Sequence, residues 1–358
     1  MFKKVWMLFL GSFALGLDAY ILVGLLPDIA QSLKSSVHLV SLGIAIFTAS
    51  YAISAPILSG LFSNIKYGLL FGLGLFFVGN LLTISAHHLT LFYVARCLAG
   101  IGAGIFSPLC VNAGKLLCNE CSKGRVLALI LGGLSIGTAF GVPISLLLVQ
   151  DKGWHVPFYF ILMCTSISTI GLLKTSFISP PFISIKNKLK NLTFRPLQKI
   201  LFISFLTAFS SLGLYSFLGI LVPQHLVLGM WCWGIGGLCG AFSAGWLLDH
   251  LLKPQTFLKI LLCTLLLGLS LLFIFPPVGC LLWGFAGWAS IVPQQYKILA
   301  FKNIDTTSTV ALNSSINYLG GAVGTALGSV LLTFFTPPLL VIVAMSVLLF
   351  NLFIVYTR

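Results

Sequence analysis

Residues 5–26 read VWMLFLGSFALGLDAYILVGLL, an apolar stretch interrupted by a single carboxylate, Asp18. About twenty apolar residues are what a helix needs to cross the hydrocarbon core of a bilayer. Lys3 and Lys4 precede the stretch as they would in a signal peptide. The apolar run is too long for one, however, and shows no small-residue cleavage site. We therefore expect a first membrane-spanning helix that is retained.

The rest of the chain repeats this pattern. Of its 358 residues, 58% are hydrophobic and 7% are charged, whereas a soluble domain carries about 25% charged residues. Backbone groups in hydrocarbon must be paired internally, so only helices or closed barrels span a membrane, and these runs are too long for barrel strands. The predicted fold is an all-α membrane protein with twelve transmembrane helices, at residues 5–26, 39–61, 68–86, 90–112, 126–149, 156–173, 200–222, 226–248, 256–275, 277–299, 308–334 and 337–356.

The longest break between apolar runs lies in the middle of the chain. It contains six Lys and Arg residues together with Pro180 and Pro181. The break predicts an N-terminal six-helix bundle at 1–173, a basic cytoplasmic linker at 174–199 and a C-terminal six-helix bundle at 200–358.

The basic residues also predict the orientation. With the N-terminus inside, 17 of the 20 Lys and Arg residues lie in loops or near span ends on the cytoplasmic side, two lie on the other side, and Arg96 lies deeper within a span. Basic loops stay in the cytoplasm, so both termini are expected there, in a multi-pass protein of the cytoplasmic (inner) membrane. Because the net charge of +14 is spread over short loops, it does not indicate a nucleic-acid partner.

The nine cysteines do not indicate a metal or cofactor. Seven lie in predicted helices, where cysteine behaves as a small apolar residue. Cys118 and Cys121 form a CxxC motif without a second pair or a nearby histidine, and we expect ordinary reduced thiols.

An internal repeat appears at a nearly constant offset of about half the chain. Gly102 and Pro108 of one span are matched by Gly287 and Pro293 of another, with the same spacing within each pair. The glycines of the span 126–149 are matched in the same way by glycines of the span 308–334. Several matches at one offset, in corresponding spans, indicate duplicated six-helix halves, which is the plan of the major facilitator transporters.

Asp18 is the acidic residue placed deep in a span, and Arg96 is the basic residue comparably placed. A carboxylate at the bilayer centre costs on the order of 3 kcal/mol, so it is normally kept for a proton relay, an ion site or a pairing charge. The two residues are expected at similar depth, close enough to form a proton-coupling site. The alternative is an ion pair that only locks the span 5–26 to the span 90–112.

The span 126–149 carries a stripe of small residues. Gly133, Gly137 and Gly141 recur every four residues and let a neighbouring helix approach closely. Pro143 frees a backbone carbonyl and permits a bend. The stripe is therefore either a packing surface alone or, in addition, a hinge or leak barrier.

Polar side chains within the spans are candidates for lining a substrate cavity. Asn313 and Asn317 share one helix face because they are four residues apart. Each such residue could instead bond a neighbouring helix. The candidates are Tyr20, Tyr51, Tyr215, Gln294, Asn313 and Asn317.

These motifs resemble the twelve-helix drug:proton antiporters, a branch of the major facilitator superfamily that includes chloramphenicol-resistance and arabinose-efflux-like permeases. The resemblance covers most of the chain, in the family's order. It is carried by Gly16-Leu-Asp18 with Gly24-Leu-Leu-Pro-Asp-Ile-Ala30, Arg96-Cys-Leu-Ala-Gly-Ile-Gly-Ala-Gly104, the glycine stripe ending Gly141-Val-Pro143, Gly153-Trp154 with Phe158, and Asn317-Tyr-Leu-Gly320. It implies that Arg96 takes part in proton coupling and that the stripe is the antiporter motif.

The predicted cytoplasmic gate departs from the family pattern. The family has an aspartate followed by several arginines in the first of these loops. Here Gly60 is followed by Asn64 in the acidic position and by Lys66 as the one basic residue. The second-half copy keeps Gly245 and Asp249 but has a histidine where arginine is usual.

The leading functional hypothesis is a proton-coupled exporter of small, largely apolar organic compounds that works as a monomer by alternating access. One alternative is an importer or facilitator of a metabolite. A second is a transport-dead membrane sensor, which the altered gate loop keeps open. A membrane enzyme would need a cluster of His, Asp or Glu in the spans, and the sequence contains none.

Overall fold

The computed structural model is helical throughout the part of the chain that it describes. Within those residues, helices occupy each of the twelve predicted spans, and ten of the helices are long and apolar enough to cross a membrane. The prediction of an all-α membrane protein with twelve spans is therefore confirmed. The described residues are 2–62, 64–117, 123–141, 143, 147, 149, 153–175, 194–301 and 306–356.

The chain divides into two compact units, Met1–Ile185 and Lys186–Arg358. The predicted linker, 174–199, includes residues 176–193, which lie outside the described residues. The helices of the first unit are α1 (Phe2–Ser32), α2 (Val37–Ile57), α3 (Ile65–Ile84), α4 (Leu89–Leu116), α5 (Lys123–Ile136) and α7 (Val156–Leu173). Those of the second unit are α9 (Arg195–Tyr215), α10 (Leu218–Leu221), α11 (Leu226–His250), α12 (Pro254–Leu271), α13 (Pro276–Ala289), α14 (Ile291–Leu299), α15 (Thr306–Phe334) and α16 (Pro338–Tyr356).

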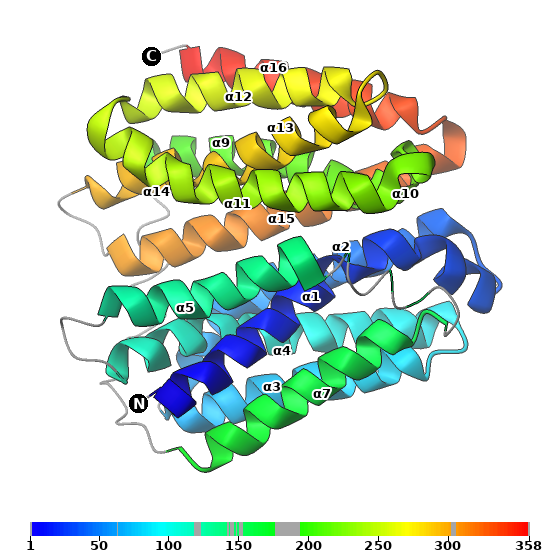
Figure 1. Cartoon of the computed structure of the whole chain (residues 1–358), viewed down its shortest axis with the longest axis vertical. Helices are drawn as coiled ribbons and strands as arrows, with labels where there is room; N and C mark the ends of the chain where they lie inside the picture. Colours follow the sequence, from blue (N-terminus) through cyan, green and yellow to red (C-terminus); the bar gives the residue numbers. More distant parts are fainter. Residues whose placement is uncertain are drawn as a thin grey trace. The chain divides into compact units, whose positions relative to one another are not determined.

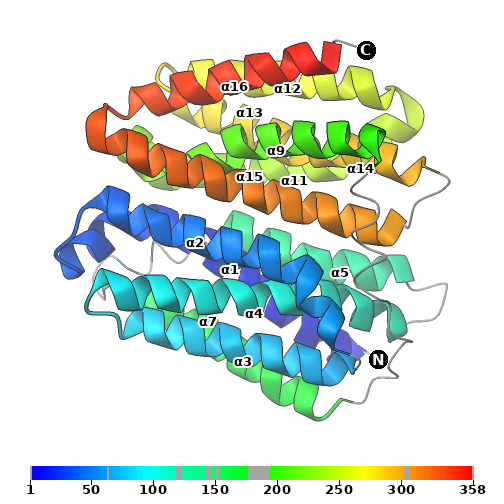
Figure 2. The ribbon, with the colours of Figure 1, turned by 180° about the vertical axis from the view of Figure 1, so that it is seen from behind.

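In the first unit, α1 packs against α2, α4, α5 and α7, while α3 and α4 run side by side (Figures 1 and 2). Glycines permit this last approach. A Cβ atom added to Gly79 would lie 2.8 Å from the Ala95 carbonyl oxygen, and one added to Gly72 would lie 3.0 Å from that of Gly102. Real Cβ atoms essentially never come as close as at Gly79 and rarely as close as at Gly72, so glycine at these positions permits the short distance between the two helices.

The second unit is built from the same kinds of contact. α9 lies along α15, α11 lies along α13, and α12 packs against α13 and α16 (Figures 1 and 2). Its core includes Trp233 and Trp283, which are fully buried. Tyr215 packs with them, and its ring stacks on Trp233 at 3.8 Å between centroids.

Three predicted spans are interrupted helices. In the span 200–222, α9 ends at Tyr215 and is followed by the short α10. In the span 277–299, the helix breaks at Ser290, just before Pro293, which has no amide hydrogen to donate to the preceding turn. In the span 126–149, α5 passes into a π-helical turn at Gly137–Gly141. Pro143 follows this turn, and because proline has no amide hydrogen, the regular hydrogen-bond pattern of the helix is interrupted here too.

The first span is longer than predicted, because α1 continues through Pro27 to Ser32. At 31 residues it is about 46 Å long, more than the hydrocarbon core requires.

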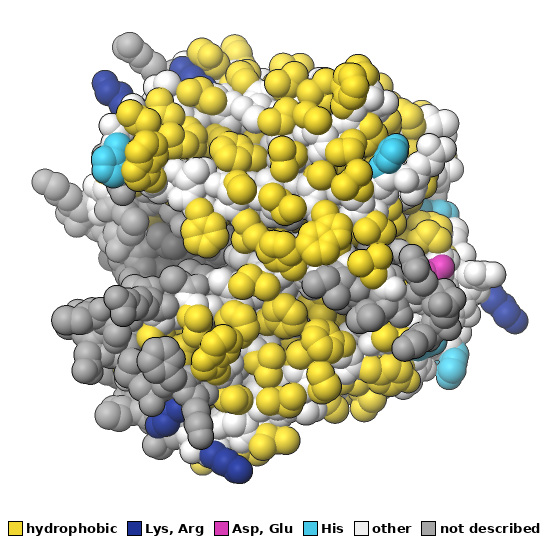
Figure 3. All heavy atoms as spheres, viewed as in Figure 1, with side chains coloured by type: hydrophobic (Ala, Val, Ile, Leu, Met, Phe, Trp, Pro, Cys, Tyr) yellow, Lys and Arg dark blue, Asp and Glu magenta, His cyan; other side chains and the backbone are white. Residues whose placement is uncertain are grey.

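The surface matches a bilayer environment. On the face drawn in Figure 3, hydrophobic side chains cover most of the described area of each unit, and Lys and Arg side chains lie towards the helix ends. Large apolar residues such as Phe242 and Phe334 are more than three-quarters exposed, at 79% and 78%. Acyl chains, rather than water, are the solvent that would make such exposure favourable.

Candidate functional site

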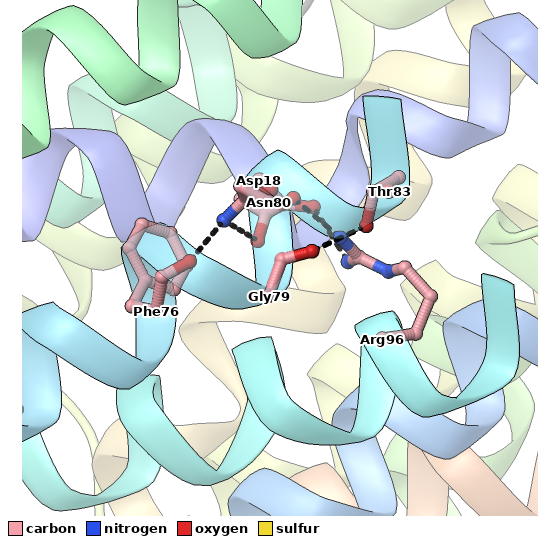
Figure 4. A network of polar contacts seen from close by, with 6 residues as sticks. All are labelled: Asp18, Phe76, Gly79, Asn80, Thr83 and Arg96. Carbon is pink, nitrogen blue, oxygen red and sulfur yellow. Dashed lines mark hydrogen bonds and ion pairs between the residues drawn. The ribbon is translucent and has the colours of Figure 1, made fainter. Parts of the chain in front are cut away.

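The middle of α1 places a carboxylate inside the first unit. Asp18 is fully buried, and α2, α4, α5 and α7 surround its helix. Arg96, on α4, is also fully buried, and its Nη1 lies 2.8 Å from Asp18 Oδ1. Its Nη2 lies 3.5 Å from the Asp18 backbone oxygen. The two residues predicted for proton coupling are thus in direct contact (Figure 4).

An aromatic ring completes the environment of the guanidinium group. The Arg96 Cζ atom lies 4.5 Å from the centroid of the Phe47 ring on α2. A desolvated cation over an aromatic face gains about 2 kcal/mol. Arg96 therefore joins three helices, while its Nε has no hydrogen-bond partner among the described residues.

The energetics of the pair favour keeping both charges together. Each buried ion has lost its hydration, which costs several kcal/mol and is offset only by the partner and by further hydrogen bonds. Removing one member of a buried pair typically destabilises a protein by about 3–5 kcal/mol. A proton that neutralises Asp18 weakens the attraction to Arg96, so the protonation state of the carboxyl is linked to how α1 and α4 are held together.

Asn80, on α3, is a member of the site that the sequence reasoning did not select. Its Nδ2 donates to Asp18 Oδ2 at 3.2 Å and to the Phe76 backbone oxygen at 3.0 Å (Figure 4). Asn80 is fully buried, and its Oδ1 has no partner among the described residues. The criterion that selects Asn313 and Asn317, an amide side chain inside an apolar span, applies equally to Asn80.

The glycine stripe of the predicted antiporter motif packs against α1. A Cβ added to Gly133 would lie 2.6 Å from the Phe9 carbonyl oxygen, and one added to Gly137 would overlap that of Phe13. Gly141 has more room, with Leu17 at 3.1 Å. The stripe thus carries the close contact between α5 and the helix that holds Asp18. Pro143 is buried, and most of its neighbours in sequence lie outside the described residues.

The predicted cavity residues of the first unit, Tyr20 and Tyr51, lie near each other and are 7% exposed each. In the second unit, Tyr215 belongs to the aromatic cluster with Trp233 and Trp283. Asn317 donates from Nδ2 to the Asn313 backbone oxygen at 3.0 Å, so part of its bonding capacity is used within α15.

Ser204 on α9 is a second residue that the sequence reasoning did not select. Its hydroxyl contacts Gln294 Oε1 and lies 2.6 Å from Asn313 Oδ1, which joins α9, α14 and α15 through side chains that are all buried. Gln294 Nε2 and Asn313 Nδ2 have no hydrogen-bond partner within the described residues. We call Ser204, Gln294 and Asn313 the neutral polar cluster.

The predicted gate residues of the first unit have local structural tasks. Asn64 is the N-cap of α3 and accepts a hydrogen bond from the Lys66 backbone nitrogen at 3.0 Å, a task that asparagine and aspartate perform equally well. Lys66 Nζ donates to the Leu173 carbonyl oxygen at the end of α7, at 2.6 Å. Gly60 lies in the short 3₁₀ turn Ser59–Leu61.

The second-half copy of the gate lies at the end of α11. A Cβ at Gly245 would meet nothing within 4 Å, so this glycine is on an open surface. Asp249 falls inside α11, and its side chain is outside what the structure describes. The CxxC motif at Cys118 and Cys121 also lies outside the described residues.

Solved structures share this fold. The crystal structure of a D-xylose-proton symporter superposes with a TM-score of 0.81, over 99% of this chain and 97% of that one, at 13% sequence identity. At this identity the likeness concerns the fold alone.

Sequence relatives are transporters. The uncharacterized MFS-type transporter YbcL of Bacillus subtilis is 25% identical over 350 residues, covering 91% of this chain and 88% of the relative. A chloramphenicol resistance protein of Streptomyces lividans is 25% identical over 163 residues, covering 45% of this chain and 42% of the relative. These relatives confirm the resemblance to the drug:proton antiporter branch. The family model described as Major Facilitator Superfamily matches residues 8–302. The chain therefore belongs to the major facilitator superfamily of membrane transporters and is not an enzyme.

Proposed function

We propose that the protein is a proton-coupled exporter of small, largely apolar organic compounds, and that Asp18 carries the proton. The observation that supports this most directly is the fully buried contact of 2.8 Å between Asp18 and Arg96. An ionisable pair inside a membrane-spanning bundle is expensive to keep and is normally functional. Protonation of Asp18 removes one charge of the pair, and this change biases the transporter between its two access states.

Export of apolar compounds is supported by composition and by the relatives. The membrane-spanning segments contain few charged side chains, which suits an uncharged or weakly charged substrate. A relative is named for resistance to chloramphenicol, a function that export would provide. Tyr20, Tyr51, Tyr215, Gln294, Asn313 and Asn317 remain proposed substrate contacts, and the glycine stripe remains the proposed hinge.

The proposal also covers the orientation of the protein in its membrane, its oligomeric state and its cytoplasmic gate. The charge distribution supports a protein of the cytoplasmic membrane with both termini in the cytoplasm and a basic cytoplasmic linker between the two six-helix bundles. We propose that the monomer is the working unit and that Gly60, Asn64, Lys66, Gly245 and Asp249 form the cytoplasmic gate.

Flux measurements in proteoliposomes test the coupling. Radiolabelled chloramphenicol is the first probe, followed by a panel of drugs and metabolites. In an antiporter, an imposed pH gradient moves the probe against the direction of proton flow. We expect the Asp18→Asn variant to lose this gradient-driven flux while it keeps counterflow, which needs no net proton movement. A proton ionophore added to the wild-type protein is the matched control, because it removes the gradient without changing the chain.

The same assay separates the alternatives. Probe movement in the direction of proton flow would identify a proton symporter, and counterflow that is insensitive to pH gradients would identify a facilitator. Absence of counterflow for every compound in the panel would favour the transport-dead sensor. Normal gradient-driven flux in Asp18→Asn would refute the proposed role of Asp18.

A further inference from the structure

The two oxygens of the Asp18 carboxyl group are held by different helices. Oδ1 accepts from Arg96 of α4 at 2.8 Å, and Oδ2 accepts from Asn80 of α3 at 3.2 Å (Figure 4). A guanidinium group can only donate hydrogen bonds, whereas an amide side chain can donate or accept. Of these two partners, Asn80 is therefore the one that could accept a hydrogen from the carboxyl group once it is protonated.

The orientation of the Asn80 amide follows from its surroundings. The group that faces Asp18 Oδ2 also lies 3.0 Å from the Phe76 carbonyl oxygen. With Asp18 ionised, both neighbours are acceptors only, so the amide nitrogen and its two hydrogens must face them. If the amide nitrogen and oxygen exchanged places, a third acceptor would face the same two oxygens. The observed orientation therefore fits an ionised carboxylate.

The opposite side of the amide is unused. Asn80 is fully buried, and its Oδ1 has no hydrogen-bond partner among the described residues. A buried acceptor without a partner costs about 1–3 kcal/mol and calls for an explanation. A protonated Asp18 would supply the partner, because a proton on Oδ2 turns that oxygen into a donor.

We propose that Asn80 is a positioning residue that follows the protonation state of Asp18. While Asp18 is ionised, Asn80 Nδ2 donates to Oδ2. When a proton from water binds Oδ2 and forms an O–H bond, the Asn80 amide rotates away from the Phe76 carbonyl oxygen: its Oδ1 accepts the new hydrogen, and its Nδ2 gives up its bonds to Asp18 Oδ2 and to Phe76. Oδ1 of Asp18 stays with Arg96, so the proton enters on the α3 side. This inference rests on the proposed role of Asp18 as the proton carrier.

The other groups near α1 do not compete for this role. Arg96 is the charged side chain that contacts Asp18 within the described residues. Polar or ionisable side chains of the other helices contact α1 at different positions. These are Tyr51 of α2 near Tyr20, Cys110 of α4 at Leu8, Thr138 of the π-helical turn at Gly16 and Ser168 of α7 at Met7.

Infrared difference spectroscopy on the full chain in lipid vesicles tests the inference without a substrate. The pH is varied from about 3 to about 10, which spans the ordinary carboxyl range and extends well above it. A protonated-carboxyl band that is missing in Asp18→Asn reports Asp18. A side-chain carbonyl band that is missing in Asn80→Leu reports Asn80, and ¹³C labelling of asparagine in the unchanged chain separates asparagine side chains from other carbonyls, so that the difference spectrum shows whether any of them changes with pH.

We expect the Asn80 carbonyl band to move to lower frequency as the Asp18 carboxyl band appears, because a carbonyl that accepts a hydrogen bond is weakened. In Asn80→Leu, the Asp18 carboxyl band should lie at higher frequency, since the protonated group has lost the oxygen that accepts its hydrogen. A purely structural role for Asn80 would leave the Asn80 carbonyl band unchanged when the carboxyl band appears.

Asn351 of α16 provides a matched control. It is equally buried, its Nδ2 donates to Ile203 O and Thr207 Oγ1, and its Oδ1 is likewise unpartnered among the described residues. Asn351→Leu therefore removes the same kind of group in the other unit, and it should leave the Asp18 carboxyl band unchanged.

Three results would overturn the inference. They are an Asn80 band that stays fixed while the Asp18 carboxyl band appears, a folded Asn80→Leu protein with the wild-type carboxyl frequency, and a carboxyl band that never appears. If Asn80→Leu does not fold, the labelled chain still gives the first result. If the Asn80 and Asp18 bands change together but the protein shows no gradient-driven flux, the proposed function is refuted and this inference stands. If the protein shows gradient-driven flux but the two bands do not change together, only this inference is refuted.

Discussion

The first unit buries an ion pair, whereas the second unit buries a cluster of neutral polar groups. Asp18, Arg96 and Asn80 join α1, α3 and α4, and Ser204, Gln294 and Asn313 join α9, α14 and α15. Both sets are almost fully excluded from solvent. Of the two sets, the first contains a carboxyl group, which changes charge when it binds a proton, and the second contains only neutral groups. Under the proposed function, proton coupling would therefore reside in the first unit and the second would contribute hydrogen bonds alone.

The two units nevertheless share one packing device. Gly133 and Gly137 let α5 approach α1, and Gly320 and Gly324 let α15 approach α9 in the same way. A Cβ at Gly320 would lie 2.5 Å from the Phe205 carbonyl oxygen. The duplicated halves thus retain a common backbone contact while their buried polar groups have diverged.

The largest effect is expected from breaking the ion pair. Arg96→Leu leaves the buried Asp18 carboxylate without its partner and should destabilise the protein by about 3–5 kcal/mol. Combining it with Asp18→Asn removes the remaining charge and should recover most of that loss. Unfolding temperatures in detergent check both variants. If Arg96→Leu alone were as stable as the wild-type protein, the ion pair could not be desolvated, contrary to the burial seen in the structure.

The shared glycine contact should give an intermediate effect. Gly137→Ala places a methyl group against the Phe13 carbonyl oxygen and should destabilise the protein by about 1–3 kcal/mol. Gly132 lies on the same helix with nothing within 4 Å of a Cβ, so Gly132→Ala should be neutral or stabilising by up to about 1 kcal/mol. Equal unfolding temperatures for the two variants would contradict the packing of α5 on α1.

The smallest effect is expected in the neutral polar cluster. Ser204→Ala removes the hydroxyl that joins two amides and should cost about 1–2 kcal/mol without moving the pH dependence of flux, because no charge changes. Ser210, on the same helix, has a buried hydroxyl without a partner in the described part of the chain, so Ser210→Ala is the matched control and should be nearly neutral. A change in the pH dependence of flux in Ser204→Ala would contradict the proposed difference in role between the two units.

Much of the architecture could be predicted from the sequence because hydrocarbon imposes a simple length rule. Within the described residues, each apolar run of about twenty residues is largely helical, and the depths of Asp18 and Arg96 along their spans placed them within reach of each other. The breaks at Ser290 and after Tyr215 were not predicted, because hydropathy does not report where a backbone hydrogen bond is missing.

The candidate site was predicted only in part. A charge in an apolar span is conspicuous, but an amide such as Asn80 could as well have bonded its own helix, as Asn317 does. Asn64 shows the opposite case. The sequence presents it as the loss of an acidic gate residue, whereas the structure gives it the capping task that an aspartate would also perform.

The sequence by itself determined that this protein spans a membrane, that it is duplicated and that it carries one deep carboxylate and one deep guanidinium group, since these depend on composition and spacing along the chain. Only the tertiary structure decided which oxygen of Asp18 each neighbour holds, that α3 supplies the second partner and that this partner keeps an unused acceptor. Those facts depend on the rotation of each helix about its axis. Close contacts at residues such as Gly79 set this rotation, and the apolar pattern of a fully hydrophobic span does not encode it.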